Sequence, residues 1–548
     1  MNNSPLLSTL VLLAAFATGC AKTSATQRGP AAGGDLLGGG QWQYRLGSRD
    51  WQNERIEVPS NYRGWAAVRV SFDVSSEVLD KAVCFELEQP TDDDLSMMDI
   101  DYRLNGRPVA PQLRERRFFL KTLRNIPTDL LKTKGNELRF KVPVSTGAEP
   151  KAFLLGEMTL RAMTPQDLAI ITGPIVGAFD DEGVWITCRT NIPAEVTLEA
   201  KSHPALREGG QDDSAARFVS VSSNTSDGLS HRLHVSLAED EAAVVYTLRA
   251  VCRDVTRQAT GEVKFWQTGQ PLRFVIHGDV QNNPAVWSRI SRAIVDEQPA
   301  FVACVGDMVE DGLCEWRWDR EFFSPAAEMF ATIPYYPTVG NHDVGYHSDI
   351  QNTGADCPLL DDFFVTPPGP RRNWSQEFDD VLLIGIAAHE NFSPGSVNYR
   401  WLENLLADSD AKYIFLVGHY QAFASEYYGV LPGDGSKPRW YLETHHMATF
   451  VVPLLVKYNA TALICGHAHY YQRSETPEGF TQVLTGNAGA GSSKGSSIPK
   501  GNNRYAVTGY AGPHYCVFEV TDGGCVMTVK TAEGQVIDTR TFQPRQRQ

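Results

Sequence analysis

The sequence predicts a multidomain protein in which two all-β domains precede a larger α/β domain. Up to about residue 270, apolar residues recur in short runs that alternate with polar ones, which is typical of half-buried strands. After Pro271, strand-length apolar runs alternate with helix-length segments, the pattern of an α/β sheet. The length of 548 residues agrees with this division, because domains usually hold about 100 to 200 residues.

The composition is that of a globular protein. Hydrophobic residues make up 42% and charged residues 21% of the chain, which excludes collagen-like, coiled-coil and mainly disordered classes. Lys and Arg total 50 against 65 Asp and Glu, a formal charge of −15. We therefore expect no specific nucleic-acid binding, and any phosphate-bearing substrate would need a local source of positive charge.

Residues 1–20 are expected to be a signal peptide. The apolar run over residues 6–17 is too short to cross a bilayer and is followed by polar chain. It ends in Ala17-Thr18-Gly19-Cys20, which resembles a bacterial lipobox and predicts a lipid tether at Cys20. We expect export to the bacterial cell envelope, in the periplasm or on the cell surface. The alternative is ordinary cleavage near Gly19, with Cys20 incidental. Residues 21–40 are predicted to form a Gly-rich flexible spacer.

Residues 41–162 are predicted to form the first β domain. Val68, Val70 and Phe72 share one face of a strand, and Asn105-Gly106 is typical of a hairpin turn. The order of these features resembles the jelly-roll accessory domains of glycosidases. Such domains bind glycans in some proteins and act as structural spacers in others, and both interpretations stay open.

Residues 163–270 are predicted to form a second β domain. Strands are expected over residues 184–189, 196–200, 233–237 and 244–251. The pattern resembles a fibronectin type III sandwich, in which Cys188 and Cys252 could face each other and form a bridge.

The chain has ten cysteines, so removing Cys20 leaves nine and at least one without an intramolecular partner. We favour a bridge between Cys314 and Cys357, which occur in loop-like sequence. Cys304 and Cys465 lie in apolar strand runs and are expected to be buried thiols.

Residues 271–548 are predicted to form the α/β domain. Strands are expected over residues 272–276, 301–305, 381–387, 413–417 and 461–465. Helices are expected over residues 285–296, 316–330, 399–407 and 447–458.

Five segments place metal-binding side chains after apolar runs, each next to a glycine. They are His277-Gly278-Asp279-Val280-Gln281, Gly306-Asp307-Met308-Val309-Glu310, Gly340-Asn341-His342-Asp343, Gly418-His419 and Gly466-His467-Ala468-His469. Side chains at strand ends can converge in one crevice of an α/β sheet, and a mixed oxygen and imidazole set suits transition metals better than Ca²⁺. Each segment alone has another explanation, such as a helix cap at Asp307 or a core histidine at His419. Their agreement favours a metal site.

The ordered motifs resemble those of the calcineurin-like metallophosphoesterases, and residues 466–473 are similar to the last motif of purple acid phosphatases. The resemblance covers about residues 271–473. It implies mixed β-sheets sandwiched by helices and a centre of two divalent or trivalent metal ions, with Fe, Zn or Mn expected. It also implies that metal-bound hydroxide attacks a phosphate ester.

The resemblance assigns a role to each matching position. Six side chains would hold the metals: Asp279, Asp307, Asn341, His419, His467 and His469. Asp307 would bridge the two ions. His342 would protonate the leaving group, and Asp343 would orient its imidazole. Arg473 would grip a phosphoryl oxygen, or else lie in a structural ion pair.

Two positions depart from the family pattern. Purple acid phosphatases have a tyrosine three residues after the bridging aspartate, where this chain has Glu310, so we expect a colourless protein without a strong visible charge-transfer band. Other members have a histidine two residues after the first aspartate, where this chain has Gln281. Gln281 is a candidate metal ligand through its carbonyl oxygen, whereas Glu310 is either a ligand or part of a solvated acidic loop.

These features predict an exported phosphomonoesterase similar to acid phosphatases. The alternative within the enzyme class is a phosphodiesterase or nucleotidase with the same metal core. The alternative from another class is an envelope lipoprotein that binds glycan or protein and has a degenerate metal site.

Overall fold

The computed structural model describes residues 34–53, 64–88, 101–109, 122–144, 158–180, 183–202, 223–224, 228–236, 243–312, 314–344, 358–387, 389–424, 445–491 and 503–546. The predictions for the signal peptide and Cys20, for most of the spacer, and for Cys357 lie outside these residues. In the part of the chain that is described, no helix has the length and apolar character needed to span a bilayer.

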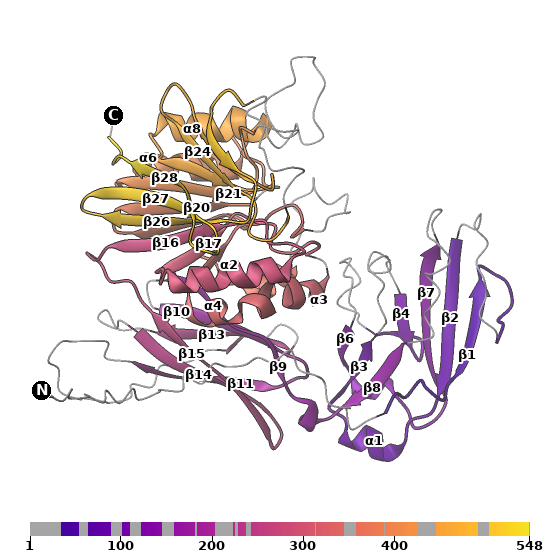
Figure 1. Ribbon diagram of the computed structural model, residues 1–548. Helices are drawn as coiled ribbons and strands as arrows, with labels where there is room; N and C mark the ends of the chain where they lie inside the picture. Colours follow the sequence, from indigo (N-terminus) through magenta and orange to yellow (C-terminus); the bar gives the residue numbers. More distant parts are fainter. Residues whose placement is uncertain are drawn as a thin grey trace, which may run out of the picture.

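The first β unit consists of two sheets that enclose a small core (Figure 1). A five-stranded sheet has the order β1-β2-β7-β4-β5, and a three-stranded sheet has the order β6-β3-β8. The elements are β1 (Gln41–Leu46), β2 (Gly64–Phe72), α1 (Ser76–Lys81), β3 (Cys84–Glu88), β4 (Asp101–Leu104), β5 (Arg107–Pro108), β6 (Thr122–Ile126), β7 (Asn136–Val144) and β8 (Thr159–Met163). The predicted turn at Asn105-Gly106 joins β4 to β5, and both residues have positive φ, 52° and 79°.

The second β unit is a sandwich of two antiparallel sheets, β12-β13-β10-β9 and β11-β14-β15. Its strands are β9 (Ile170–Asp180), β10 (Gly183–Thr190), β11 (Glu195–Ser202), β12 (Ser223–Asn224), β13 (Ser230–Ser236), β14 (Ala243–Cys252) and β15 (Val255–Lys264). Alternate residues of facing strands, such as Ile186 and Leu248, fill the space between the sheets. All four predicted strands are present, whereas assignment to the fibronectin type III class stays a prediction. The bridge that the sequence left possible between Cys188 and Cys252 is not formed, because both residues are buried free thiols.

The α/β part has four layers, with two mixed sheets face to face and helices on both outer sides (Figure 1). The first sheet has the order β18-β17-β16-β26-β27-β28, and the second has the order β19-β20-β21-β22-β24-β23-β25. Helices α2 and α4 cover the first sheet, and α6 and α8 cover the second. The strands of the first sheet are β16 (Leu272–His277), β17 (Phe301–Cys304), β18 (Tyr335–Pro337), β26 (Tyr515–Thr521), β27 (Gly524–Lys530) and β28 (Val536–Phe542). Those of the second are β19 (Trp374–Phe378), β20 (Val381–Ile386), β21 (Tyr413–Gly418), β22 (Ala462–Cys465), β23 (Tyr471–Glu475), β24 (Thr481–Thr485) and β25 (Ala506–Tyr510). The helical segments are α2 (Pro284–Asp296), α3 (Glu315–Arg317), η6 (Trp318–Phe323), η7 (Ser324–Ala326), α4 (Ala327–Thr332), α5 (Pro358–Phe363), α6 (Val397–Asp408), η9 (Met447–Val451) and α8 (Val452–Lys457).

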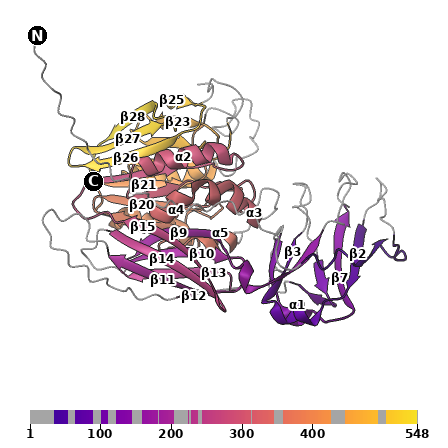
Figure 2. The same cartoon turned by 60° about the horizontal axis from the view of Figure 1, so that its bottom comes forward.

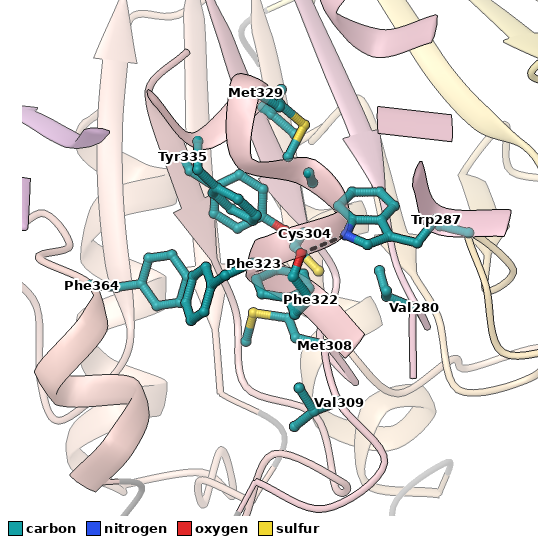
Figure 3. Close-up of a cluster of buried hydrophobic side chains, with 14 of the residues drawn as sticks. Val280, Trp287, Cys304, Met308, Val309, Phe322, Phe323, Met329, Tyr335 and Phe364 are labelled. Carbon is teal, nitrogen blue, oxygen red and sulfur yellow. Dashed lines mark hydrogen bonds between the residues drawn. The ribbon is translucent and has the colours of Figure 1, made fainter. Parts of the chain in front are cut away.

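The five predicted strands of this domain are confirmed, but the predicted helix over residues 316–330 is divided into α3, η6, η7 and α4. Pro325 interrupts it, because proline cannot donate the backbone hydrogen bond of a regular helix. The strands after Cys465 were not predicted. Aromatic side chains of η6 pack on the outer side of the first sheet together with Trp287 of α2. The indole Nε1 of Trp287 donates to the carbonyl of Phe322 at 2.9 Å (Figure 3).

The sandwich of β9 to β15 docks onto the α/β part. The hydroxyl of Tyr246 donates to the carbonyl of Ala331 at 2.7 Å, and the hydroxyl of Thr187 donates to the carbonyl of Phe363 at 2.5 Å. Arg189 also pairs with Glu315 at 3.2 Å, and both side chains are about nine-tenths buried. The sheet of β1, β2 and β7, in contrast, lies away from the α/β part in both views (Figures 1 and 2).

Candidate metal centre

The predicted metal ligands lie in loops that follow the strands of both sheets. Asp279 follows β16 and Asp307 follows β17, and these two strands are parallel neighbours in the first sheet. His419 and His467 follow β21 and β22, which are parallel neighbours in the second sheet. The carboxyl ends of both strand pairs therefore supply ligands to one place between the sheets.

The backbone at this place is held in an uncommon conformation. Asp279, Gln281, Asp307 and His467 all have positive φ, at 54°, 43°, 54° and 70°. Residues other than glycine rarely adopt this left-handed backbone conformation, which usually costs about 1 to 3 kcal/mol at each position. The amide of Asp279 donates to the carbonyl of Gly306 at 3.0 Å, so hydrogen bonds between the loops hold these turns. Such strain is most often found at functional sites.

Glycines allow the loops to approach each other closely. A Cβ atom on Gly340 would lie 2.2 Å from the Oδ1 atom of Asp307, and one on Gly466 would lie 2.2 Å from the Oδ2 atom of Asp279. Both positions therefore require glycine because the neighbouring carboxylate fills the space that a side chain would need.

Four candidate ligand atoms converge in the centre of this arrangement. The Nε2 atom of His419 lies 2.9 Å from Asn341 Oδ1, 3.2 Å from Asp307 Oδ2 and 3.2 Å from His467 Nδ1. His467 Nδ1 is also 2.9 Å from Asn341 Oδ1. The carbonyl of Val305 accepts a hydrogen bond from His419 Nδ1 at 3.0 Å, so once Nε2 has lost its proton, its lone pair is directed to the centre.

This set fits a metal ion. A carboxylate oxygen, an amide oxygen and two imidazole nitrogens are electron-pair donors that first-row transition metals bind well. The candidate ligand atoms of Asp307, His419 and His467 all lie within 4.8 Å of one another. A cation bound among them would remove the repulsion between the lone pairs of neighbouring acceptor atoms.

The other predicted ligands lie beside this group. His469 Nε2 is 3.6 Å from Asp279 Oδ1, and both oxygens of Asp279 accept the backbone amide of His467 at 2.9 and 3.1 Å. The amide nitrogen of Gln281 donates to Asp307 Oδ2 at 3.0 Å. The structure thus brings together all six predicted ligands and Gln281, while their roles as ligands stay predictions.

A comparison with family models matches residues 272–471 to the calcineurin-like phosphoesterases. Residues 272–471 form a calcineurin-like phosphoesterase domain. The match covers every position from β16 to the start of β23, including all the candidate ligands. The resemblance inferred from the motifs is confirmed.

Similar curated proteins are purple and tartrate-resistant acid phosphatases. Tartrate-resistant acid phosphatase type 5 of Oryctolagus cuniculus is 26% identical over 250 residues, which cover 39% of this chain and 72% of that protein. A protein of Arabidopsis thaliana named "Probable inactive purple acid phosphatase 9" is 23% identical over 302 residues, which cover 49% of this chain and 44% of that protein. The chain thus spans less than half the length of this plant relative.

A solved structure shares the fold over most of the chain. It is a purple acid phosphatase from seeds of yellow lupin (Lupinus luteus), with a TM-score of 0.57, 13% identity, and coverage of 89% of this chain and 94% of that chain. The family and the relatives support a metal-dependent phosphoester hydrolase. Phosphoesterases of the purple acid phosphatase type use a dinuclear metal centre.

Burial and charge shift the pKa values of the ligands in the phosphoesterase domain. Burial raises the pKa of Asp279 well above its usual range, and the nearby carboxylate of Asp307 raises it further. Burial also opposes ionisation of Asp307, but the positive charges of His419 and His342 hold its pKa well below the usual range. Burial lowers the pKa of His419, but Asp307 and Asp279 outweigh that effect and raise it to about 9. In the metal-free protein, the second proton on the His419 imidazole therefore supplies positive charge beside Asp307 and Asp279.

We expect metal binding to release this proton. Because the pKa of His419 is raised to about 9 in the metal-free protein, the imidazole is charged at neutral pH and must lose a proton to bind a metal. The apparent metal affinity should therefore rise with pH up to about 9 and level off above it. Calorimetric titration with Zn²⁺ in buffers of different ionisation enthalpy measures the released protons. Equal heats in all buffers at pH 7 would contradict the expectation.

His342 presents one ring nitrogen to the site. Its Nδ1 atom lies 2.7 Å from the backbone carbonyl of Glu310, so Nδ1 is the donor, and its Nε2 lies 3.9 Å from Asp307 Oδ2. The amide of Glu310 donates to the buried carboxylate of Glu321 at 2.9 Å, and Arg317 pairs with Glu321 at 2.5 Å. Sequence reasoning missed Glu321, although a carboxylate within the aromatic segment Trp318–Phe323 was a signal for a buried, partnered acid.

Asp343 has a different role from the predicted one. Its carboxylate accepts the backbone amides of Asp307 at 2.9 Å, Met308 at 2.9 Å and Gly340 at 2.8 Å. It therefore holds the loop that carries Asp307, whereas the Glu310 carbonyl orients the His342 imidazole. Burial and the charge of Asp307 raise the pKa of Asp343 to about 6.

The carboxylate of Glu310 lies beside His342. One of its oxygens is 3.9 Å from His342 Nδ1 and accepts from the Asn282 amide at 3.3 Å, and the side chain is 28% exposed. Its place agrees better with a partly solvated loop than with a metal ligand.

Arg473 lies in a structural ion pair, so the expectation that it grips a phosphoryl oxygen is not supported. Its Nε atom donates to Asp538 of β28 at 2.7 Å, and Nη1 pairs with Glu475. Arg473 and Asp538 side chains are 10% and 12% exposed. The guanidinium joins β23 of the second sheet to β28 of the first.

Replacing Arg473 with Gln should therefore affect stability more than catalysis. Removing one partner of a buried ion pair costs roughly 3 to 5 kcal/mol because the other charge stays buried. We expect urea denaturation at a clearly lower concentration, with kcat/KM for a phosphate ester changed by less than about threefold. A 100-fold loss of kcat/KM at unchanged stability would instead favour a substrate contact.

Proposed function

We propose that this protein is an exported, metal-dependent phosphomonoesterase similar to acid phosphatases. The observation that carries the proposal is the convergence of four side chains on one point, where His419 Nε2 lies 2.9 to 3.2 Å from the ligand atoms of Asn341, Asp307 and His467. The relatives named as tartrate-resistant acid phosphatases support the choice of a phosphomonoester over a diester.

Two ions would be held by two ligand sets that share Asp307. One set is Asn341, His419 and His467, and the other is Asp279 and His469. Gln281 contacts the shared ligand, because its amide nitrogen donates to Asp307. Ions bound here would neutralise the phosphoryl oxygens and lower the pKa of a coordinated water from 15.7 to about 7. They would supply the local positive charge that a chain of net charge −15 lacks. We expect Fe, Zn or Mn, which suit imidazole and carboxylate ligands.

The chain's own contribution to the chemistry is the placement of a proton. Nδ1 of His342 donates to the Glu310 carbonyl, so Nε2 is the ring atom on the side of Asp307, and the imidazolium form would carry its second proton there. That proton is available to the oxygen of the departing alcohol, which is a poor leaving group without it. Asp343 keeps the Asp307 loop in position by accepting two of its backbone amides, and it accepts a third amide from Gly340 in its own loop.

One assay separates the candidate functions. Purified protein is loaded with Zn²⁺, Mn²⁺ or Fe²⁺ and given 4-nitrophenyl phosphate or bis(4-nitrophenyl) phosphate. Preferred turnover of the monoester is the expected result. Preferred turnover of the diester would favour a phosphodiesterase or nucleotidase, and absence of both turnover and bound metal would favour an envelope binding protein.

The proposal places the protein in the bacterial cell envelope with a lipid tether at Cys20, on the strength of residues 1–20 alone. In cells, Cys20→Ala should move the protein from the membrane fraction to the soluble fraction. An unchanged distribution would contradict the tether.

A further inference from the structure

The outward face of the five-stranded sheet carries a row of arginines. Arg69 of β2 pairs in register with Arg139 of β7, and Arg139 pairs with Arg103 of β4. Residues that alternate with them, such as Val70 and Leu138, lie in the core on the opposite face. Three guanidinium groups thus extend from neighbouring strands, which lie about 4.8 Å apart.

The indole of Trp51 contacts three arginine side chains on this face of the sheet. The guanidinium carbons of Arg45, Arg69 and Arg139 lie 4.7, 4.4 and 5.6 Å from the centre of its ring. Cation–π contacts of this kind hold a guanidinium in place without neutralising its charge. We call Arg45, Arg69, Arg103, Arg139 and Trp51 the arginine face.

The arginines of this face differ in how far the protein compensates their charge, and Arg103 donates to the Gly106 carbonyl at 3.4 Å. Arg69 donates to Gln43 at 2.8 Å and lies 3.4 Å from Glu137, a pair in which both side chains are about one-third exposed. Among the described residues, the side chains of Arg45 and Arg139 make no hydrogen bond or ion pair, and the Nε atom of each is buried without a partner. Like charges opposite each other on a sheet are destabilising, so an external anion would relieve a cost that the fold itself carries.

We propose that the arginine face binds an acidic polysaccharide through its carboxylate or sulfate groups. The guanidinium fork matches these groups in a bidentate manner, and a row of forks across a sheet suits a linear polymer with regularly repeated charges. Because Arg45 and Arg69 already lie over the Trp51 ring, we expect arginine contacts to acidic groups, and not stacking of a neutral sugar on that ring, to dominate binding. The chain's net charge of −15 opposes every polyanion, and it opposes nucleic acids most strongly because their charge density is the highest.

The face is separate from the metal centre. Strands β1, β2 and β7 lie on the far side of the first β unit from the α/β part in both views (Figures 1 and 2). Binding and hydrolysis can therefore fail independently, and the inference does not depend on the proposed phosphatase activity.

The test uses the full chain and two kinds of substitution. Arg69→Gln with Arg139→Gln removes two charges from the face, and Glu137→Gln removes the acid that pairs with Arg69. The matched control is Arg273→Gln with Arg289→Gln, two exposed arginines of the α/β part that each pair with a glutamate. Affinity is measured for polygalacturonate, dextran sulfate, neutral dextran and double-stranded DNA, and turnover of 4-nitrophenyl phosphate reports on folding and the distant site.

We expect salt-sensitive binding to polygalacturonate or dextran sulfate, and the tighter of the two identifies the anionic group. The double arginine variant should lose at least about tenfold in affinity, Glu137→Gln should bind more tightly, and the control should change by less than twofold. Binding of neutral dextran as tight as that of the acidic polymers would overturn the proposal, and so would tighter binding of DNA. Equal loss in the control variant, or no change in any variant, would do the same.

Discussion

Asp307→Asn is expected to abolish phosphoester turnover and to reduce bound metal from two ions to at most one. Asparagine keeps the shape of the side chain but removes the negative charge, and it offers one oxygen where a bridging carboxylate offers two. Asp307 Oδ2 lies 3.2 Å from His419 Nε2, while Oδ1 accepts the backbone amide of His342 at 2.8 Å. We expect kcat/KM to fall by roughly 10³-fold or more, since a bound cation is the main electrostatic stabiliser of the transition state.

The matched control for this substitution is Asp380→Asn. Asp380 pairs with Lys412 on the surface at 2.7 Å, so its loss changes the net charge equally while leaving the centre intact. Metal analysis and turnover are measured on both variants after a thermal denaturation curve has shown that both are folded. Full turnover with full metal content in Asp307→Asn would exclude this site as the reaction centre.

His342→Ala is expected to separate substrates by their leaving groups. An alkyl phosphate needs a proton on its departing oxygen, and general acid catalysis of this kind contributes about 10²-fold to 10⁴-fold. A nitrophenolate leaves without one, so turnover of 4-nitrophenyl phosphate should change far less. The measurement is kcat for an alkyl phosphate and a nitrophenyl phosphate in the variant and in the wild type.

The result depends on His342 acting through Nε2 and not only through packing. His342→Gln is the second variant, because it fills the site and can bond to the Glu310 carbonyl but cannot donate a proton as an acid. It should behave like His342→Ala toward alkyl phosphates. If both variants lose the same factor on both substrates, the general-acid role is wrong and His342 is a positioning residue.

Local patterns in the sequence were enough to predict five strands of the α/β part and the candidate ligands that lie together near their ends. Most candidate ligands follow a continuous apolar run that forms a buried strand, as Asp307 follows β17, and this relation is visible within a few residues. Asn341 instead follows the short strand β18, which was not predicted. Convergence of the ligands follows from the rule that parallel strands end at one edge, so it could be predicted without knowing the strand order.

Side-chain roles that depend on residues far away in the sequence could not be predicted. The sequence does not decide between a substrate contact and a structural ion pair for Arg473, because its partner Asp538 lies 65 residues further along the chain, on a strand that was not predicted. The role of Asp343 depends on backbone amides of the Asp307 loop, which carry no sequence signal. The arginine face likewise depends on strand register, which pairs Arg69 with Arg139 across 70 residues of sequence.

Diffraction at the absorption edge of the bound metal tests the central claim most directly. We predict two anomalous peaks about 3.5 to 4 Å apart in crystals of the metal-loaded protein. One should be bonded to Asn341, His419 and His467, the other to Asp279 and His469, with Asp307 between them. A fully loaded crystal with a single peak, or with peaks away from Asp307, would contradict the dinuclear centre.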